Sequence, residues 1–276
     1  MVPTIPHYKV ISCGEEIRTT GNSPIKVITE NYEAYLAKNS KALNPATDII
    51  NELLAHCFLK LWNLKTPAAA ILDFSPTLLL PEYTKSHHRP TYYQKPIFGS
   101  SWLEGAFDST AFFKANGKFD TKVFFDFNDL FKIGLFDIWV ENDDRKPTNL
   151  NLMFLENDDG KFTIIPIDHC YIFSTMNYQD LKPEDFFPIA NENLLVTDLA
   201  RSLKKYKHAN RMWDKEDKDY FYLCISACEK YFDEIINFIP KEWNFTVADA
   251  TNLKSFLFNA ERNSKVFADY LEKTSS

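Results

Sequence analysis

The chain has 276 residues, which is long enough for one large domain or two lobes and for an enzyme. Its 45% hydrophobic and 25% charged residues are ordinary for a globular protein and exclude general disorder. A formal net charge of −7 argues against nonspecific binding to nucleic acid or to anionic lipid.

The sequence contains no membrane-spanning or targeting segment, no C-x-x-C motif and no familiar glycine-rich nucleotide-binding loop. No run approaches the roughly 18 apolar residues that span a bilayer, and the start has no basic region followed by an apolar one. The five cysteines are an odd number and form no C-x-x-C pair, so we expect reduced core thiols. The glycines form neither a Rossmann fingerprint nor a Walker loop. We therefore expect a cytoplasmic protein that uses neither membrane nor direct nucleic-acid contact.

The first third of the chain predicts a small sheet with one helix. Residues 8–38 alternate in short runs separated by turn residues, which predicts antiparallel strands. Residues 44–61 begin with Asn-Pro, as a capped helix does, and carry apolar side chains at helical spacing. Residues 68–74 and 91–98 are predicted as further strands. We therefore expect a β-rich N-terminal lobe over residues 1–98.

The remainder, residues 99–276, is predicted to be a larger and mostly helical lobe. It is irregular at first, and apolar spacing over residues 127–142 then predicts a buried helix. The runs LNLMFL and KFTIIPI flank Asn-Asp-Asp-Gly at 157–160, a strong signal for a β-hairpin. Three segments beyond residue 190 have helical periodicity and predict a bundle. The fold class is therefore expected to be α+β.

The hairpin brings polar residues to its open end. With its tip at residues 158 and 159, Asn149 stands opposite Asp168, and a one-residue bulge could shift this match. Asp144 precedes Asn149 by the D-x-x-x-x-N interval of protein-kinase catalytic loops, where the Asp accepts the hydroxyl proton and the Asn binds magnesium. Oxygen donors of this kind suit Mg²⁺. The pattern predicts phosphoryl transfer from ATP, with Asp144 as base and Asn149 and Asp168 as metal ligands.

Two alternatives remain open at this hairpin. Asp143 competes with Asp144 for the role of base, since a misjudgement of one residue exchanges them. Each Asp or Asn by itself is explained as well by the preference of these residues for loop ends, so it is the combination that indicates phosphoryl transfer. Arg145 follows the Asp, whereas an Arg precedes it in the common protein-kinase loop.

The run FDIWVENDDRKPTNLNLMF, followed by IPIDHCYIF, resembles the HipA-like kinases, distant relatives of protein kinases and phosphoinositide kinases. Their catalytic loop is of the N-D-R-x-x-x-N type and their metal motif of the I-D-x-G type. The resemblance implies a bilobal protein-kinase-like fold with ATP between the lobes. It makes Asp144 the base, Asn149 and Asp168 the Mg²⁺ ligands, and Arg145 an organiser of the loop. Two departures are Lys146, where relatives often have His, and Cys170, where a Gly is frequent.

The resemblance extends to the N-terminal third with weaker motifs. Lys38 ends a predicted strand and Glu52 lies on the predicted helix, similar to the lysine and glutamate that position nucleotide phosphates in the family. Lys26, on the preceding strand, is the competing lysine. Such charges are otherwise usually solvated.

Two further segments are candidates for contact with the nucleotide. Gly21, Asn22 and Ser23 lie between strands, where backbone N–H groups could face the phosphates, and they are equally consistent with a plain turn. The segment QKPIFGS resembles the family's linker between lobes, which implies that backbone near Phe98 meets adenine.

Three functions follow from these observations. The first is a HipA-like serine/threonine kinase of toxin–antitoxin type, with an antitoxin-like partner and an unidentified protein or small-molecule acceptor. The second is a catalytically weak or inactive kinase fold that serves as a binding or regulatory module, because of Lys146, Cys170 and the missing glycine-rich loop. The third is a small-molecule or lipid kinase, and the acidic charge argues against a membrane-bound lipid substrate.

Overall fold

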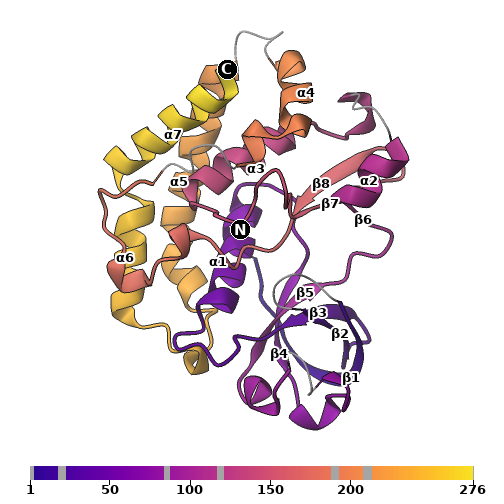
Figure 1. The fold of residues 1–276 in the computed structure, drawn as a ribbon. Coiled ribbons are helices and arrows are strands. Elements are labelled where there is room, and N and C mark those ends of the chain that lie inside the picture. Colours follow the sequence, from indigo (N-terminus) through magenta and orange to yellow (C-terminus); the bar gives the residue numbers. More distant parts are fainter. Residues whose placement is uncertain are drawn as a thin grey trace.

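The computed structural model describes residues 3–17, 23–83, 88–116, 121–187, 193–207 and 213–275. It has a β-rich N-terminal part and a largely helical C-terminal part, as expected for an α+β protein. Figure 1 shows the β-barrel at one end of the molecule and the helices α3 to α7 toward the other, with α1 between them. Within the described part of the chain, no helix combines the length and the apolarity that crossing a membrane requires.

The N-terminal part is a closed β-barrel with the strand order β1-β2-β3-β5-β4. Its strands are β1 (His7–Glu16), β2 (Ile25–Thr29), β3 (Ala34–Lys38), β4 (Ala69–Asp73) and β5 (Ile97–Ser101). β1 and β4 are parallel, and the other neighbours are antiparallel. In β2 the side chains at positions 25, 27 and 29 are buried, which is the period of two that a closed barrel needs.

The strand predicted over residues 91–98 is wrong in its first half. Pro90–Tyr93 forms a 3-10 turn, and β5 begins only at Ile97, directly after Pro96. Proline lacks the N–H group that a ladder requires, so the strand starts after it. Residue 98, where a lobe boundary was expected, lies inside β5.

Helix α1 (Thr47–Leu61) connects the barrel with the helical part. It begins at Thr47 and not at Asn44, because the Oδ1 of Asn44 accepts a hydrogen bond of 2.6 Å from the Nδ2 of Asn244 in place of capping the helix. Every residue from position 49 to position 59 is buried, because the barrel covers one face of α1 and the C-terminal helices cover the other.

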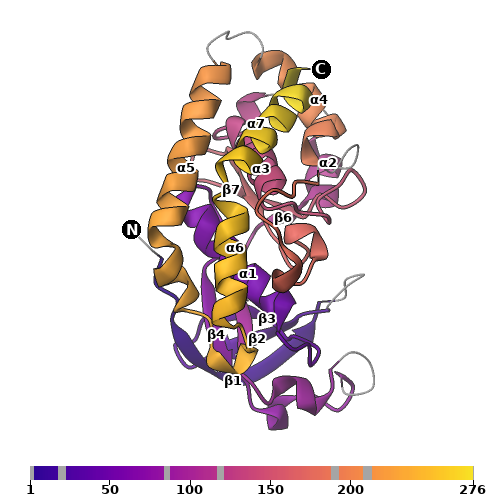
Figure 2. The same ribbon diagram turned by 90° about the vertical axis from the view of Figure 1, so that its left-hand side faces the viewer.

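The C-terminal part contains a small sheet and six helices within the described residues. The sheet has the order β6-β7-β8, with β6 (Phe107–Asp108), β7 (Leu152–Glu156) and β8 (Phe162–Pro166). The helices are α2 (Ser109–Asn116), α3 (Asn128–Trp139), α4 (Asp198–Lys207), α5 (Trp213–Ile236), α6 (Val247–Leu257) and α7 (Ala260–Ser275). α2 lies in the segment that was expected to be irregular. Figure 2 shows α5, α6 and α7 together on one face of the molecule.

An aromatic cluster holds α1 against α3. Trp62, just after α1, stacks on Trp139 with ring centroids 5.5 Å apart and meets the edge of Phe136 at 5.3 Å. Phe58 contacts Trp139 at 5.4 Å. Aromatic pairs in these geometries add about 0.5–1.5 kcal/mol each beyond their buried area. The cluster therefore fixes α1, which borders the barrel, relative to the helix that leads into the predicted catalytic loop.

Candidate active site

A cavity of about 490 Å³ lies between the barrel and the β7–β8 hairpin. One part of its wall is apolar and includes side chains from β3, β5 and β7, namely Leu36, Phe98 and Met153. Another part is polar and includes Lys38, Glu52 and Asp168, which are far apart in the sequence. The cavity thus combines an apolar surface with a cluster of charges, as sites for small ligands commonly do.

Lys38 occupies the centre of the charge cluster. Its Nζ contacts the Oε1 of Glu52 on α1, and it lies 3.1 Å from the Oδ1 of Asp168, which follows β8. The Lys38 and Glu52 side chains are only 10% and 7% exposed, whereas that of Asp168 is 37% exposed. Lys38, Glu52 and Asp168 are therefore brought together as their predicted roles require, and Asp168 is the member that reaches the open space.

The electrostatics of the cluster favour a charged Asp168. Burial alone would lower the pKa of Lys38, but the carboxylates of Asp168 and Glu52 raise it above its usual range. Burial raises the pKa of Glu52 despite the neighbouring ammonium group. Burial would also raise the pKa of Asp168, but Lys38 lowers it below its usual range. The carboxylate nearest to solvent thus remains an anion.

The predicted catalytic loop is closed by side-chain amides. The Oδ2 of Asp144 accepts hydrogen bonds from the Nδ2 of Asn149 at 3.0 Å and from the Nδ2 of Asn151 at 2.9 Å. Within this loop, the main-chain N–H and C=O groups of Lys146 and Asn149 form two hydrogen bonds with each other, at 2.9 and 3.0 Å. This turn explains why an Asp and an Asn five positions apart meet. Asn151 was missed by the sequence analysis, although it stands in the same polar run.

The hairpin register differs from the expected one by one residue. Leu152 pairs with Pro166 and Met153 with Ile165, so Asn149 lies outside the ladder and is not opposite Asp168. The reason is a three-residue turn: Asn157 N–H donates to the carbonyl of Lys161 at 2.8 Å. Gly160, with φ of 70°, supplies the left-handed residue that such a turn needs.

Arg145 is buried behind the loop and paired with Asp137. The Nε of Arg145 donates to the Oδ2 of Asp137 at 2.7 Å, and the two side chains are 0% and 2% exposed. Asp137 comes from α3 and also accepts from the Nδ2 of Asn142 at 2.9 Å. The sequence feature that could have indicated this ion pair is a single Asp on the apolar face of a predicted helix. A buried carboxylate there needs a partner, since an unpaired buried charge is costly.

The same guanidinium group connects the catalytic loop with the segment that carries Asp168. It donates to the carbonyl of Ile167 at 3.3 Å and contacts the Nε2 of His169 at 2.9 Å. These residues flank Asp168, whose φ of 57° is in the left-handed region that non-glycine residues seldom adopt. Arg145 also donates to the carbonyl of Leu150 at 2.9 Å. Arg145 thus contacts both the predicted catalytic loop and the segment that carries Asp168, and its role as a loop organiser stays a prediction.

Cys170 lies beside Asp168 and is anchored to α1. Its Sγ donates to the Oδ1 of Asp168 at 3.4 Å, and its carbonyl accepts from the Nδ2 of Asn51 at 2.8 Å. The Oδ1 of Asn51 in turn accepts from the Tyr178 hydroxyl at 2.6 Å. Burial and the Asp168 carboxylate raise the pKa of the Cys170 thiol. Asn51, one residue before Glu52, was not predicted to contribute, and its only signal is a polar side chain within an apolar helix.

The alternative residues are separated by the structure. The Nζ of Lys26 lies over the ring of Trp102 at 4.1 Å, so Lys38 and not Lys26 joins the carboxylates. Burial raises the pKa of Asp143, whose N–H donates to the carbonyl of Tyr171 at 3.0 Å. By contrast, the side-chain amides of Asn149 and Asn151 both donate to Asp144.

The predicted nucleotide contacts near the barrel are described only in part. Ser23 is buried with φ of 44°, and Pro24 after it lines the cavity. Gly21 and Asn22 lie outside the described residues. Phe98 is buried and lines the cavity. The connection to the C-terminal part follows Ser101, later than the predicted linker at residues 94–100.

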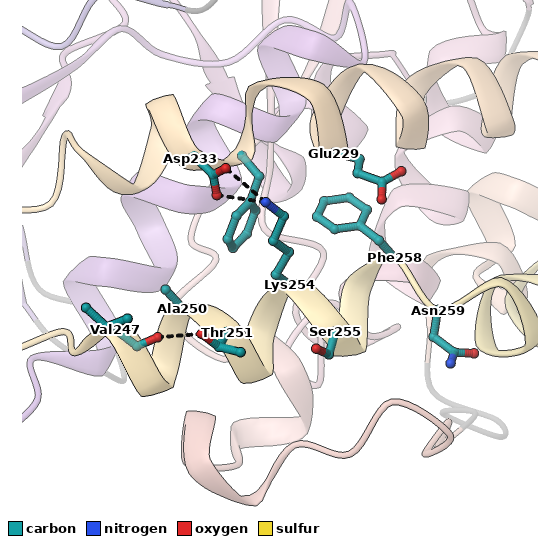
Figure 3. Close-up of a pocket in the computed structure, with 10 residues that line it drawn as sticks. Glu229, Asp233, Val247, Ala250, Thr251, Lys254, Ser255, Phe258 and Asn259 are labelled. Atoms are coloured by element: carbon teal, nitrogen blue, oxygen red, sulfur yellow. Dashed lines mark hydrogen bonds and ion pairs between the residues drawn. The ribbon is translucent and has the colours of Figure 1, made fainter.

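A second concavity, of about 470 Å³, lies on the surface between α5 and α6 (Figure 3). Lys254 of α6 reaches toward Asp233 of α5 and donates to both of its oxygens at 2.8 and 2.9 Å. The residues predicted from the sequence to carry chemistry are elsewhere, so this surface is not the candidate active site.

The buried ion pair generates a stability prediction. We expect Asp137→Ala to lower the free energy of unfolding by about 3–5 kcal/mol, because Arg145 would stay buried without its carboxylate. The control is Asp198→Ala, which removes the exposed partner of Arg201 and should cost less than about 1 kcal/mol. Urea denaturation of the three proteins measures both values. Equal losses in the two variants would contradict the importance assigned to the buried pair.

His56, on the cavity wall, generates a pH prediction. Burial lowers the pKa of its side chain from 6.5 to about 4. Between these pH values the unfolded chain binds a proton that the folded chain does not, so stability should fall as the pH is lowered from 6.5 to 4 and this contribution should level off below. His56→Gln should flatten that decline, whereas His7→Gln, at an exposed position, should not. Urea midpoints measured across this range provide the test, and an unchanged slope in His56→Gln would refute it.

Comparison with known proteins identifies the family of this chain. The model of the HipA-like kinase family matches residues 15–268. A search of curated proteins found no match. Among solved structures, the proinflammatory kinase CtkA of Helicobacter pylori aligns with a TM-score of 0.53 and 15% identity, covering 99% of this chain and 98% of that one. This likeness concerns the fold alone. The resemblance read from the catalytic and metal motifs is thus confirmed by a match over most of the sequence, and the chain belongs to the HipA-like kinase family.

Proposed function

We propose that this protein is an ATP- and Mg²⁺-dependent phosphotransferase that transfers the γ-phosphoryl group to a serine or threonine hydroxyl of a protein. The observation that carries the proposal is Lys38, held between Glu52 and Asp168 on the wall of the cavity. Kinases use a lysine fixed by a glutamate to position nucleotide phosphates, and a carboxylate nearby to bind the metal. Family membership implies the use of ATP and a divalent metal in general terms.

We further propose that the barrel and the helical part act as two lobes with ATP between them. The division expected between residues 1–98 and 99–276 then falls after Ser101, where β5 ends. The apolar wall with Leu36 and Phe98 suits the adenine ring, and the Lys38 end suits the phosphates. The contact of residues 21–23 with the phosphates stays a prediction of the sequence. His56 also supports a polar occupant, because its buried Nδ1 has no hydrogen-bond partner in the described part of the chain.

Asp168 and Asn149 would hold the magnesium ion. Their donor atoms are the carboxylate and amide oxygens that Mg²⁺ prefers, and the charge on Asp168 is favoured by Lys38. When bound, the ion neutralises charge on the phosphate oxygens. Arg145 bonds to the main-chain carbonyl of Ile167 and to the side chain of His169, on either side of Asp168, which would preserve the distance between the metal-binding segment and the catalytic loop.

Asp144 would act as the general base. Its Oδ2 is held by the two amides, which orients the carboxylate so that the Oδ1 can accept the proton of the acceptor hydroxyl. The proton must move as the hydroxyl oxygen attacks phosphorus, so the base has to be fixed within hydrogen-bond reach. The buried Arg145–Asp137 pair provides that rigidity.

A binding or regulatory module with weak or no activity is the second candidate. Cys170 stands where the family frequently has a glycine, two residues after Asp168, and its Sγ donates a hydrogen bond to one of the Asp168 oxygens. A small-molecule or lipid acceptor would keep the same chemistry with a different substrate. The toxin–antitoxin role, an antitoxin-like partner and a cytoplasmic location stay predictions of the sequence.

Nucleotide binding can be tested through thermal stability. We expect ATP to raise the melting temperature in the presence of Mg²⁺, because ligand at 100 times its Kd stabilises a protein by about 2.7 kcal/mol. Asp168→Ala should lose the Mg²⁺-dependent part of this shift. Asp108→Ala, a control at another carboxylate of the cavity, should retain it. A shift that does not depend on Mg²⁺ in the unaltered protein would contradict the metal assignment.

Phosphoryl transfer can be tested separately from binding. Asp144→Asn should keep the ATP-dependent melting shift and lower the rate of transfer by about 10²-fold or more, since general-base catalysis contributes that much. Asp143→Asn is the control for the neighbouring carboxylate. The rate of transfer is measured with radiolabelled ATP, with generic proteins and the chain itself as acceptors. Full activity in Asp144→Asn with loss in Asp143→Asn would move the base by one residue, and binding without turnover in the unaltered chain would favour the module.

A further inference from the structure

The candidate active site contains a thiol that the proposed chemistry does not use. The Sγ of Cys170 lies 3.4 Å from the Oδ1 of Asp168, and one ligand atom each of Cys170, Asp168 and Glu52 falls within 4.8 Å of the others. Glu52 comes from α1, whereas Asp168 and Cys170 come from the segment after β8. Small movements would bring three such atoms to the spacing of ligands around one metal ion.

Side-chain hydrogen bonds hold α1 and the segment after β8 together. Asn51 precedes Glu52 on α1, and its Nδ2 donates to the carbonyl of Cys170 at 2.8 Å. The Tyr178 hydroxyl orients the Asn51 amide with a bond of 2.6 Å. Asn51, Cys170 and Tyr178 are all buried. Hydrogen bonds from neighbouring groups thus hold the main chain beside Glu52 and Cys170 in place. Binding of an ion requires the Lys38 ammonium group to move away from the Glu52 and Asp168 oxygens.

The donor set differs from what magnesium prefers. Mg²⁺ is hard and takes oxygen ligands, whereas Zn²⁺ accepts sulfur, nitrogen and carboxylate oxygen together. A nitrogen is also close by, since His56 lies one helical turn after Glu52 and lines the same cavity. Its buried Nδ1 has no hydrogen-bond partner in the described residues, and the imidazole is neutral at pH 7, the form that binds metals.

We propose that Glu52, Asp168 and Cys170 form an inhibitory site for a thiophilic divalent cation such as Zn²⁺, which excludes the productive Mg²⁺ complex of ATP. The consequence for activity rests on the proposed function, but the binding itself does not. The thiol gives its proton to water as the sulfur–metal bond forms. The divalent ion and Lys38 together then balance the charges of two carboxylates and one thiolate.

The two metals are mutually exclusive for a geometric reason. Asp168 is the carboxylate proposed to hold Mg²⁺, and Glu52 is the partner that fixes Lys38. An ion bound to both removes the Mg²⁺ ligand and weakens the hold on the lysine that positions the phosphates. We therefore expect Zn²⁺ to inhibit, and excess Mg·ATP to relieve the inhibition.

Binding is tested first, with cobalt alone and the full-length chain without nucleotide. Co²⁺ accepts the same donors as Zn²⁺ and gives a near-ultraviolet charge-transfer band when a thiolate coordinates it. We expect this band to saturate at one equivalent, to disappear when Zn²⁺ is added, and to be absent in Cys170→Ser. Cys13→Ser is the matched control, because Cys13 is a half-buried thiol on β1 and should leave the band unchanged.

A chain without the band, or a band that persists in Cys170→Ser, overturns the inference. Because Cys170→Ser could misfold, its melting temperature is compared with that of the unaltered chain, and Asp168→Asn provides a second variant in which the band should weaken. If Cys170→Ser does misfold, the unaltered chain and Asp168→Asn decide the test, and a full-strength band in Asp168→Asn refutes the proposed ligand set.

Inhibition is measured second. In the kinase assay, Cys170→Ser should raise the Zn²⁺ concentration for half-inhibition by about tenfold or more, the scale on which metal sites lose affinity when their shell is altered. Inhibition equal in both proteins would refute the inhibitory role. If the chain proves to have no kinase activity but the cobalt band is present, the metal site stands and only the proposed function fails. Kinase activity without the cobalt band refutes the metal site and leaves the proposed function standing.

Discussion

A lysine buried among carboxylates is the constraint on which this structure depends. Removing the Lys38 ammonium group from water is costly unless anions compensate for it, and two are present, Glu52 and Asp168. They come from a helix and from the end of a hairpin, so the barrel, α1 and the β7–β8 hairpin must meet at this point. Lys38 keeps Asp168, the member that faces the cavity, in its anionic form. An anion at this position is what the proposed divalent cation would bind.

The rest of the scaffold holds the groups around this cluster at fixed distances. The aromatic contacts of Trp62 and Trp139 set α1 against α3, and α3 delivers Asp137 to the interior. Asp137 in turn binds Arg145, whose remaining donors reach the backbone beside Asp168. A chain of packed and hydrogen-bonded groups thus runs from the core to the candidate metal ligand. Rigidity of this kind keeps a catalytic group within a fraction of an ångström of its working position.

The departures from the common kinase pattern have a structural explanation in part. Arg145 follows the candidate base where protein kinases have an Arg before it, yet it is fully buried and organises the same loop. Cys170 stands in place of a frequent glycine, and its carbonyl is bound by Asn51 of α1. The main chain after Asp168 is therefore attached to α1, next to the glutamate of the ion cluster. Nothing in the structure explains the lysine at position 146.

The sequence by itself determined the elements and the chemical types. Alternation predicted the first three strands, apolar spacing predicted α1 and α3, and the interval between Asp144 and Asn149 predicted a kinase loop, because these patterns are local. Asn44 was wrongly predicted as a helix cap, since its side chain bonds to a residue 200 positions away. The strand over residues 91–98 and the hairpin register also failed, through Pro96 and a three-residue turn.

Only the tertiary structure decided which charges belong together. The sequence analysis favoured Lys38 and kept Lys26 as the competing lysine, and packing placed Lys26 over Trp102 and Lys38 between carboxylates. Asn51 gained its hydrogen bonds to Cys170 and Tyr178 from segments that no local pattern connects with α1. The physical reason is that helix and strand periods report on which face is buried, whereas the energy of a buried charge depends on partners that long-range folding supplies.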